Sequence, residues 1–169
     1  ALGERRAEAR ASAAAWVGSL GQGASVPALT AAVRKEKKDV VRAALLAALR
    51  ECGGDLGEFL SPRALGAEAA RGLKSKTPSS LAAWFDFDSL PPVHWSDGAG
   101  GPTGLVDPDI VRWWVVLADR LKDPSGRGII TLYLSLLETA DAAALAGHVV
   151  RAWAERDARH PDPEESRAH

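Results

Sequence analysis

Apolar residues recur at helical spacing along most of the chain. In the first segment they fall at i, i+4, i+7, i+8 and i+11, and one helical face carries Ala9, Ala13, Trp16, Val17 and Leu20. The sequence GQG at 21–23 ends this first helix, because glycine readily adopts the backbone conformation that follows a helix.

Two more helices are predicted before the second glycine pair, at 53–54. Ser25 can cap the second helix, and Pro27 is tolerated in its first turn. The third begins at about Asp39. Its apolar face holds Val41, Leu45, Ala48, Leu49 and Cys52.

The first and third helices resemble each other at an offset of 32 residues. RASAAAWVGSLGQG aligns with RAALLAALRECGGD, so that Trp16 matches Ala48 and Gly21 matches Gly53. Helix pairs that repeat at this spacing are typical of an α-solenoid, in which each pair buries its apolar stripe against its neighbours. The tetratricopeptide and ankyrin patterns are absent, so we expect short HEAT-like repeats over 1–60. The alternative is two unrelated Ala-rich amphipathic helices.

The remaining helices are predicted from their start signals. Short helices are expected over 61–83, where Ser61-Pro62 and Thr77-Pro78 can each begin one. Asp107 followed by Pro108 is the clearest start in the chain. The helix after it is expected to be central, because its apolar positions are Ile110, Val111, Trp114, Val115, Leu117, Ala118 and Leu121.

The C-terminal third is also expected to be helical over 107–158. The stretch GIITLYLSLLE at 128–138 has a β-branched start that suits a strand, but its leucine spacing and helical neighbours favour a helix. The last helix is expected from Asp141, with Leu145, Val149, Ala152 and Trp153 on one face. Residues 159–169 form a polar tail.

The segment from about 84 to 106 has no helical pattern, and it is rich in glycine and proline. A loop of this length inside a domain is uncommon. WFDFDSL alternates like a strand but has no obvious partner, so no β-structure is expected. We predict an aromatic-anchored latch, with a ligand-binding loop as the alternative. In the latch, apolar side chains enter grooves between helices and acidic ones face water, as follows: Trp84, Phe85, Phe87, Leu90, Val93 and Trp95 inward; Asp86, Asp88 and Asp97 outward.

Candidate interaction or latch residues follow from this segment and from the central helix. Adjacent helical positions point about a third of a turn apart, so one of Trp113 and Trp114 can be core while the other packs elsewhere. Trp113 becomes a candidate partner contact if it is exposed. The full set is Trp84, Phe85, Trp95, Asp97 and Trp113.

Composition is that of one folded domain, which we place at 1–158. Of 169 residues, 46% are hydrophobic and 25% charged, so intrinsic disorder is disfavoured. The net charge is -1, and the one short basic run, RKEKK at 34–38, contains a glutamate. Binding of nucleic acid through this segment is therefore not expected. The chain has no methionine and begins within a helical pattern, which suggests a fragment of a longer polypeptide.

Motifs for catalysis or metal binding are missing. The single cysteine, Cys52, excludes an internal disulfide, and there is no Cys-x-x-Cys or His-x-x-x-His spacing for zinc. GAGGPTG at 98–104 lacks the Lys-Ser/Thr ending of a phosphate loop. His94 and Asp97 could form an acid–base pair, although surface pairs of this kind are common. We expect no catalytic residue, metal or cofactor, and no membrane span, which makes a cytoplasmic setting the default.

Part of the chain resembles a known family. LPPVHWSDG, a short Gly-rich spacer, VDPDIVRWWVVLADRLKDP and LYLSLLETADAAALAGHVVRAW are similar to a large bacterial family of long HEAT-like repeat proteins. These often carry a WGR domain and are loosely grouped with molybdate-metabolism-regulator-like proteins. The resemblance covers roughly residues 40–158.

The resemblance implies a multi-repeat cytoplasmic scaffold and no established reaction. The expected function is therefore a non-catalytic scaffold or protein–protein interaction segment of a larger bacterial protein. Its partners would be other proteins or other domains, with self-association through the N-terminal helix as a possibility. The alternative is a nucleic-acid-associated HEAT-like protein or an enzyme acting on DNA bases, which would use aromatics and an aspartate in a basic groove.

Overall fold

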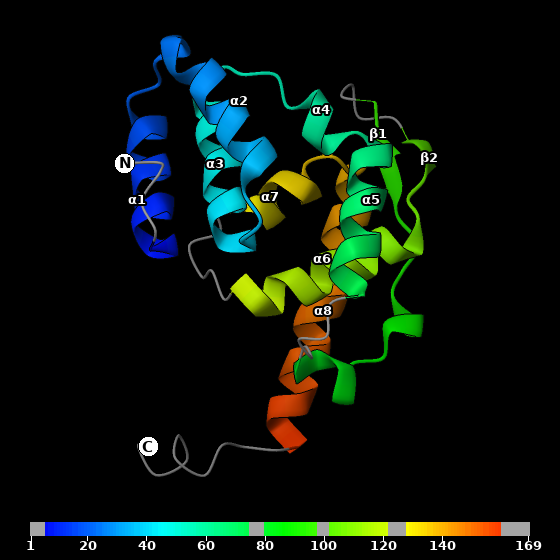
Figure 1. The fold of residues 1–169 in the computed structure, drawn as a ribbon. Coiled ribbons are helices and arrows are strands. Elements are labelled where there is room, and N and C mark those ends of the chain that lie inside the picture. Colours follow the sequence, from blue (N-terminus) through cyan, green and yellow to red (C-terminus); the bar gives the residue numbers. More distant parts are fainter. Residues whose placement is uncertain (1–5, 75–79, 98–101, 122–127, 160–169) are drawn as a thin grey trace.

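Helices make up most of the protein in the computed structural model, which describes residues 6–74, 80–97, 102–121 and 128–159 (Figure 1). The mostly helical class expected from the sequence is confirmed. The α-helices are α1 (Ala7–Ser19), α2 (Val26–Lys35), α3 (Asp39–Glu51), α4 (Gly57–Leu60), α5 (Pro62–Leu73), α6 (Pro108–Leu121), α7 (Ile129–Leu134) and α8 (Thr139–Arg159). Short 3-10 turns lie at Gly23–Ser25, Ser80–Ala83 and Phe87–Ser89.

Helices α1 and α3 lie side by side, with α2 packed against α3 (Figure 1). Helices α1 and α3 are each 13 residues long, and α3 begins and ends 32 positions after α1. Gly21 and Gly53 follow them with φ of 60° and 75°. This left-handed conformation costs a side-chain-bearing residue about 1–2 kcal/mol, so the two glycines end their helices in the same way.

The apolar face predicted for α1 is wrong in its rotation about the helix axis. Ala14 and Gly18 are the buried residues of α1, whereas Trp16 is 64% exposed and Leu20 48% exposed. A Cβ atom added to Gly18 would lie 2.9 Å from the Cα of Ala48 on α3. The two helices approach through small residues, and this close approach leaves no room for the large side chains between them.

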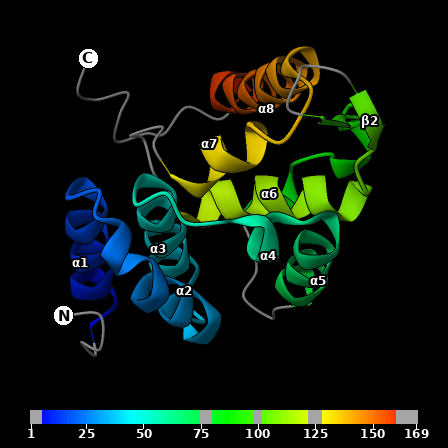
Figure 2. The same cartoon turned by 90° about the horizontal axis from the view of Figure 1, so that it is seen from above.

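Helix α6 is central, as its sequence predicts. It lies crosswise to α3 rather than alongside it, with α5 on one side and α7 and α8 on the other (Figure 2). The Asp107 carboxylate accepts the Asp109 backbone N–H at 2.9 Å and so caps its start. The apolar residues buried on α6 include Ile110, Val111, Trp113, Trp114, Val115, Val116 and Leu117.

Two other helix starts behave differently from each other. Ser61 Oγ accepts the Ala64 N–H at 3.3 Å, which confirms the predicted cap of α5. Ser25 makes no side-chain cap on α2, because it already belongs to the preceding 3-10 turn. Thr77 and Pro78, the other predicted start, lie outside the described residues.

The segment expected to contain no β-structure forms a small hairpin. Strands β1 (His94–Ser96) and β2 (Pro102–Leu105) pair antiparallel, with Trp95 opposite Gly104 and an irregularity between Trp95 and Ser96. The strand partner lay within the same segment, but a strand of three residues is too short for its alternation to be recognised. The three α-helices after the hairpin, α6, α7 and α8, match their predicted type, although α7 is only six residues long.

Helix α8 runs to Arg159, one residue beyond the predicted helical region of 107–158. The rest of the predicted tail, 160–169, lies outside the described residues. Near this end, α8 packs on the segment around Trp84 and Phe85. Together with α6 they form a second small apolar cluster, built on Leu81, Phe85 and Val115.

Candidate functional site

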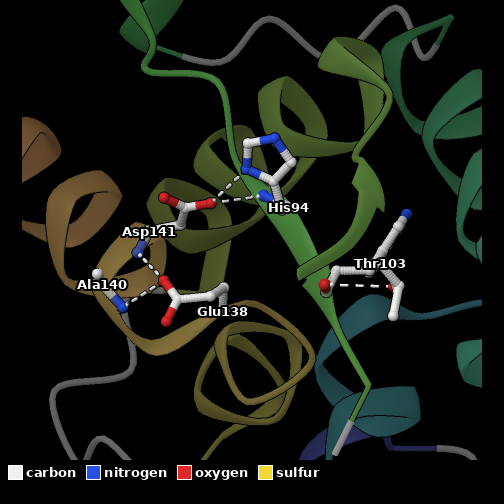
Figure 3. A network of polar contacts seen from close by, with 6 residues as sticks. His94, Thr103, Glu138, Ala140 and Asp141 are labelled. Carbon is white, nitrogen blue, oxygen red and sulfur yellow. Dashed lines mark hydrogen bonds and ion pairs between the residues drawn. The ribbon is translucent and has the colours of Figure 1, made fainter. Parts of the chain in front are cut away.

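The hairpin is fastened to the start of α8 by hydrogen bonds (Figure 3). The backbone N–H of His94 donates to Asp141 Oδ2 at 2.8 Å, and the ring Nδ1 of His94 lies 2.8 Å from the same oxygen. The Glu138 N–H donates to the His94 carbonyl at 2.9 Å, and the Ser96 N–H donates to the Leu136 carbonyl at 2.9 Å. β1 is thus joined on both sides of Trp95 to the turn between α7 and α8.

Glu138 supports this junction by capping α8. Its Oε2 accepts the N–H groups of Ala140 at 2.8 Å and Asp141 at 3.1 Å (Figure 3). The hydrogen bond from the His94 side chain, followed by that from its backbone, holds the pKa of Asp141 below its ordinary value. The carboxylate therefore stays charged at the helix N-terminus, where negative charge is favourable.

The imidazole of His94 pairs with Asp141 on α8 and not, as was predicted, with Asp97. Asp97 is exposed at the end of β1. An Asp-oriented imidazole could transfer a proton, but that chemistry needs a substrate cavity beside it. Neither of the two grooves described below includes His94 in its lining. The His94–Asp141 pair holds strand β1 against the start of α8.

The aromatic residues singled out in the loop pack in two separate regions, one around Trp95 and the other around Trp84 and Phe85. Trp95 is half-buried and meets Trp114 edge-on, with ring centroids 6.0 Å apart. Phe85 is buried, and Trp84 is half-buried between Phe85 and Trp153, at centroid distances of 5.7 and 6.3 Å. The acidic residues of the same segment, Asp86, Asp88 and Asp97, are exposed as predicted.

Trp113 is not an exposed contact residue. It is 2% exposed, and its indole N–H donates to Glu68 Oε1 at 3.0 Å. The hydroxyl of Tyr133 donates to the same oxygen at 2.8 Å. Both tryptophans of the pair are core, and Trp113 reaches a carboxylate on α5 that no local pattern connects to it.

A charged cleft of about 530 Å³ lies between the α2–α3 layer and helices α4, α5 and α6. Ion pairs cross it at three places. Arg34 on α2 makes a two-bond contact with Glu58 on α4, Arg42 on α3 faces Glu68 on α5 at 3.5 Å, and Arg120 on α6 lies 3.9 Å from Asp39 on α3. Sequence reasoning missed this cleft, because each pair joins residues far apart in the chain.

Burial shifts the pKa of two groups here, Asp39 in the cleft and Tyr133, which is bonded to Glu68. Burial raises the pKa of Asp39, and the charge of Arg120 opposes that rise. Burial, with the neighbouring Glu68 carboxylate, raises the pKa of the Tyr133 hydroxyl well above its ordinary range. Tyr133 therefore stays a neutral donor to Glu68. Three ion pairs and the hydrogen bond from Tyr133 thus join the elements on either side of the cleft.

A second groove, of about 350 Å³, lies between the C-terminal half of α8 and the segment 84–89. Aromatic side chains form one wall and arginines the other. The residues that line it include Trp84, Phe85, His148, Arg151, Arg156 and Arg159. No local pattern could have revealed this groove, since Trp84 and Arg156 are 72 positions apart and come together only in the fold.

Helix α1 carries two large apolar side chains that are exposed, Trp16 at 64% and Leu20 at 48%. We use the name α1 outer face for these two residues. Elsewhere, Val150 on α8 and Leu105 on β2 are also exposed, at 65% and 59%.

Within the described residues, no group of three or more His, Cys, Asp or Glu side chains could hold a metal ion. Among the same residues, no helix has the length and apolar character needed to cross a bilayer. Comparisons with known family models, with curated proteins and with solved structures return no match for this chain.

Proposed function

We propose that this chain is a non-catalytic, helical-repeat scaffold segment of a larger bacterial protein, and that it binds a further helical repeat through the α1 outer face. The observation that carries the proposal is the equivalence of α1 and α3. Their bounds differ by 32 residues and their terminal glycines adopt the same conformation. Positions on α1 can therefore be compared with the positions on α3 that α1 itself covers.

The comparison identifies the two exposed apolar residues. Ala48 of α3 lies against Gly18 of α1, and the α1 position equivalent to Ala48 is Trp16. Cys52 lies with its sulfur 3.8 Å from the Val17 carbonyl of α1, and its equivalent is Leu20. The positions that α1 buries on α3 are thus the positions that are exposed on α1.

The occupant we infer is a helix with an apolar face, stacked on α1 as α1 is stacked on α3. Trp is larger than Ala, so the occupant is not a copy of α1, whose inner face is built for close approach through Ala14 and Gly18. It must instead offer a recess for the Trp16 ring. Burying a side chain of this size stabilises an interface by about 2–3 kcal/mol.

The experiment removes the α1 outer face without touching the fold. Trp16→Gln with Leu20→Gln should leave the melting temperature within a few degrees, because both side chains are exposed. With that further helix absent, two copies of the chain should cover each other's α1 outer faces instead. Analytical ultracentrifugation over a dilution series should therefore show self-association of the parent chain that the double variant loses. Val150→Gln, which removes an equally exposed apolar residue from α8, is the matched control and should associate like the parent.

Amide hydrogen exchange gives the second measurement. Where the chain remains monomeric, an uncovered α1 should exchange faster than α3, since one of its faces has no neighbour. A strictly monomeric chain with α1 amides as strongly protected as those of α3 would contradict the proposal and indicate a self-contained domain.

The alternative, a nucleic-acid-associated protein or DNA-base-acting enzyme, draws little support from the charged cleft. An aspartate and arginines are present there, but Arg34, Arg42 and Arg120 each face a carboxylate. Phosphate binding needs cations whose charge is available. Tight duplex DNA binding that falls steeply with salt would favour the alternative over the scaffold.

A further inference from the structure

The groove between α8 and residues 84–89 holds an arginine in an arrangement suited to carboxylate binding. The Arg156 guanidinium lies over the Trp84 ring, with its central carbon 4.5 Å from the ring centroid. Trp84 is itself supported edge-on by Phe85 and on another side by Trp153. A guanidinium stacked in this way has lost much of its rotational freedom while its N–H edges remain able to bind a carboxylate in two-pronged fashion.

Hydrogen-bond donors outnumber acceptors along this groove. Arg151 is exposed and has no ion-pair partner in the described part of the chain. Arg159 has only the surface glutamate Glu155, at 3.5 Å with both side chains mostly exposed, and such pairs are weak. An acceptor-rich, negatively charged ligand would pair with these two arginines.

The lining also distinguishes among negatively charged ligands. Asp86 and Glu155 lie in the same groove as the arginines. A continuous polyphosphate chain would meet these carboxylates at close range and be repelled. A peptide can place single carboxylates opposite the arginines and leave neutral residues beside Asp86 and Glu155. The volume of about 350 Å³ is at the small end of ligand sites, which suits a short segment.

We propose that this groove binds an acidic peptide segment of a partner protein. Arg156 takes one carboxylate through its two-pronged edge, and Arg151 takes a second. The aromatic wall of Trp84 and Phe85 contacts the apolar part of the peptide. The groove is formed by other elements than the α1 outer face, and its occupancy does not depend on the scaffold function proposed above.

The test uses the full chain and two short labelled peptides, one with two glutamates in a neutral sequence and the other with glutamines at those positions. Fluorescence anisotropy should give binding at least about tenfold tighter for the glutamate peptide. Arg156→Lys, which keeps the charge but removes the planar fork, should weaken it about tenfold, and Arg151→Gln similarly. Arg112→Gln is the matched control, because Arg112 is also exposed and stacked on an aromatic ring, that of Phe87 at 4.7 Å, outside the groove lining.

Three results would overturn the proposal. They are equal affinity for the two peptides, no binding up to about 1 mM peptide, or an Arg156→Lys variant that binds as tightly as the parent. Should Arg156→Lys disturb folding, seen as a lowered melting temperature, the exposed Arg151→Gln decides instead. A single-stranded oligonucleotide that binds more tightly than the glutamate peptide, with a steep loss of affinity in salt, would assign the groove to nucleic acid and reject the peptide.

Discussion

The hydroxyl of Tyr133 on α7 donates to Glu68 on α5 across a distance of 2.8 Å, and the indole N–H of Trp113 on α6 reaches the same carboxylate oxygen. Arg42 on α3 faces the other oxygen at 3.5 Å. One half-hidden carboxylate therefore joins four helices. Removing it leaves the two donors without their acceptor and Arg42 without its ion-pair partner.

Glu68→Ala should lower the free energy of unfolding by about 3 kcal/mol, because a largely buried charge partner is lost. Glu68→Gln should cost less, since the amide oxygen can still accept from Tyr133 or Trp113. Urea denaturation gives both values. Glu155→Gln, in an exposed pair with Arg159, serves as control and should change stability by no more than about 0.5 kcal/mol. An effect of Glu68→Ala no larger than that of Glu155→Gln would show that the carboxylate does not join the helices.

Trp95→Ala should loosen the hairpin. The ring is half-buried and meets Trp114 edge-on, so we expect a loss of about 2 kcal/mol and faster proteolysis between Asp86 and Pro108. Thermal melting and limited proteolysis followed by mass spectrometry measure these effects. Leu105→Ala, on the paired strand and mostly exposed, should leave both nearly unchanged. A melting temperature untouched by Trp95→Ala would favour the binding-loop alternative over the latch.

Asp141→Asn should lose a contribution to stability that depends on pH. The pKa of Asp141 is depressed in the folded protein by its bonds to His94, so the charged form stabilises the fold above its unfolded pKa of about 3.9. The stability difference between the parent chain and Asp141→Asn should be constant above about pH 5 and shrink as pH falls through the folded-state pKa.

Urea midpoints at several pH values between neutral and acid would measure that difference. Asp157→Asn, which removes one exposed carboxylate from the same helix, controls for the change in net charge. A difference that widens on acidification would contradict the assigned role of the His94–Asp141 pair.

Gly18→Ala should destabilise the protein even though alanine favours helices. The added Cβ would lie 2.9 Å from the Cα of Ala48, and backbone cannot give way as a side chain can. We expect a cost of about 1–2 kcal/mol, with faster amide exchange in α1. Gly104→Ala, where an added Cβ meets nothing within 4 Å, is the control. A more stable Gly18→Ala would mean that α1 and α3 can separate freely.

Local chemistry explains which parts of the fold could be predicted. The caps at Asp107 and Ser61 and the two terminal glycines depend on a few neighbouring residues, and each appears where the sequence placed it. The inward face of α1 could not be read from large side chains, because the contact with α3 is made by Ala14 and Gly18.

The candidate surfaces were less predictable, because they depend on pairs distant in sequence. The burial of Phe85 and the water-facing acids of the loop follow from polarity alone. By contrast, the pairing of His94 with Asp141, of Glu68 with Arg42 and of Arg156 with Trp84 arises only when separate helices meet. No nearby residue pattern specifies such meetings.

The hairpin junction has a consequence for the order in which the chain folds. Helices α1 to α3 contact one another within the first 51 residues, so their loops close at small entropic cost. Strand β1 instead bonds to the turn before α8. The hydrogen bonds of His94 cannot form until Asp141, 47 positions later, has been synthesised. During synthesis, the N-terminal layer can therefore consolidate first, while the aromatic segment stays open until the last helix has left the ribosome.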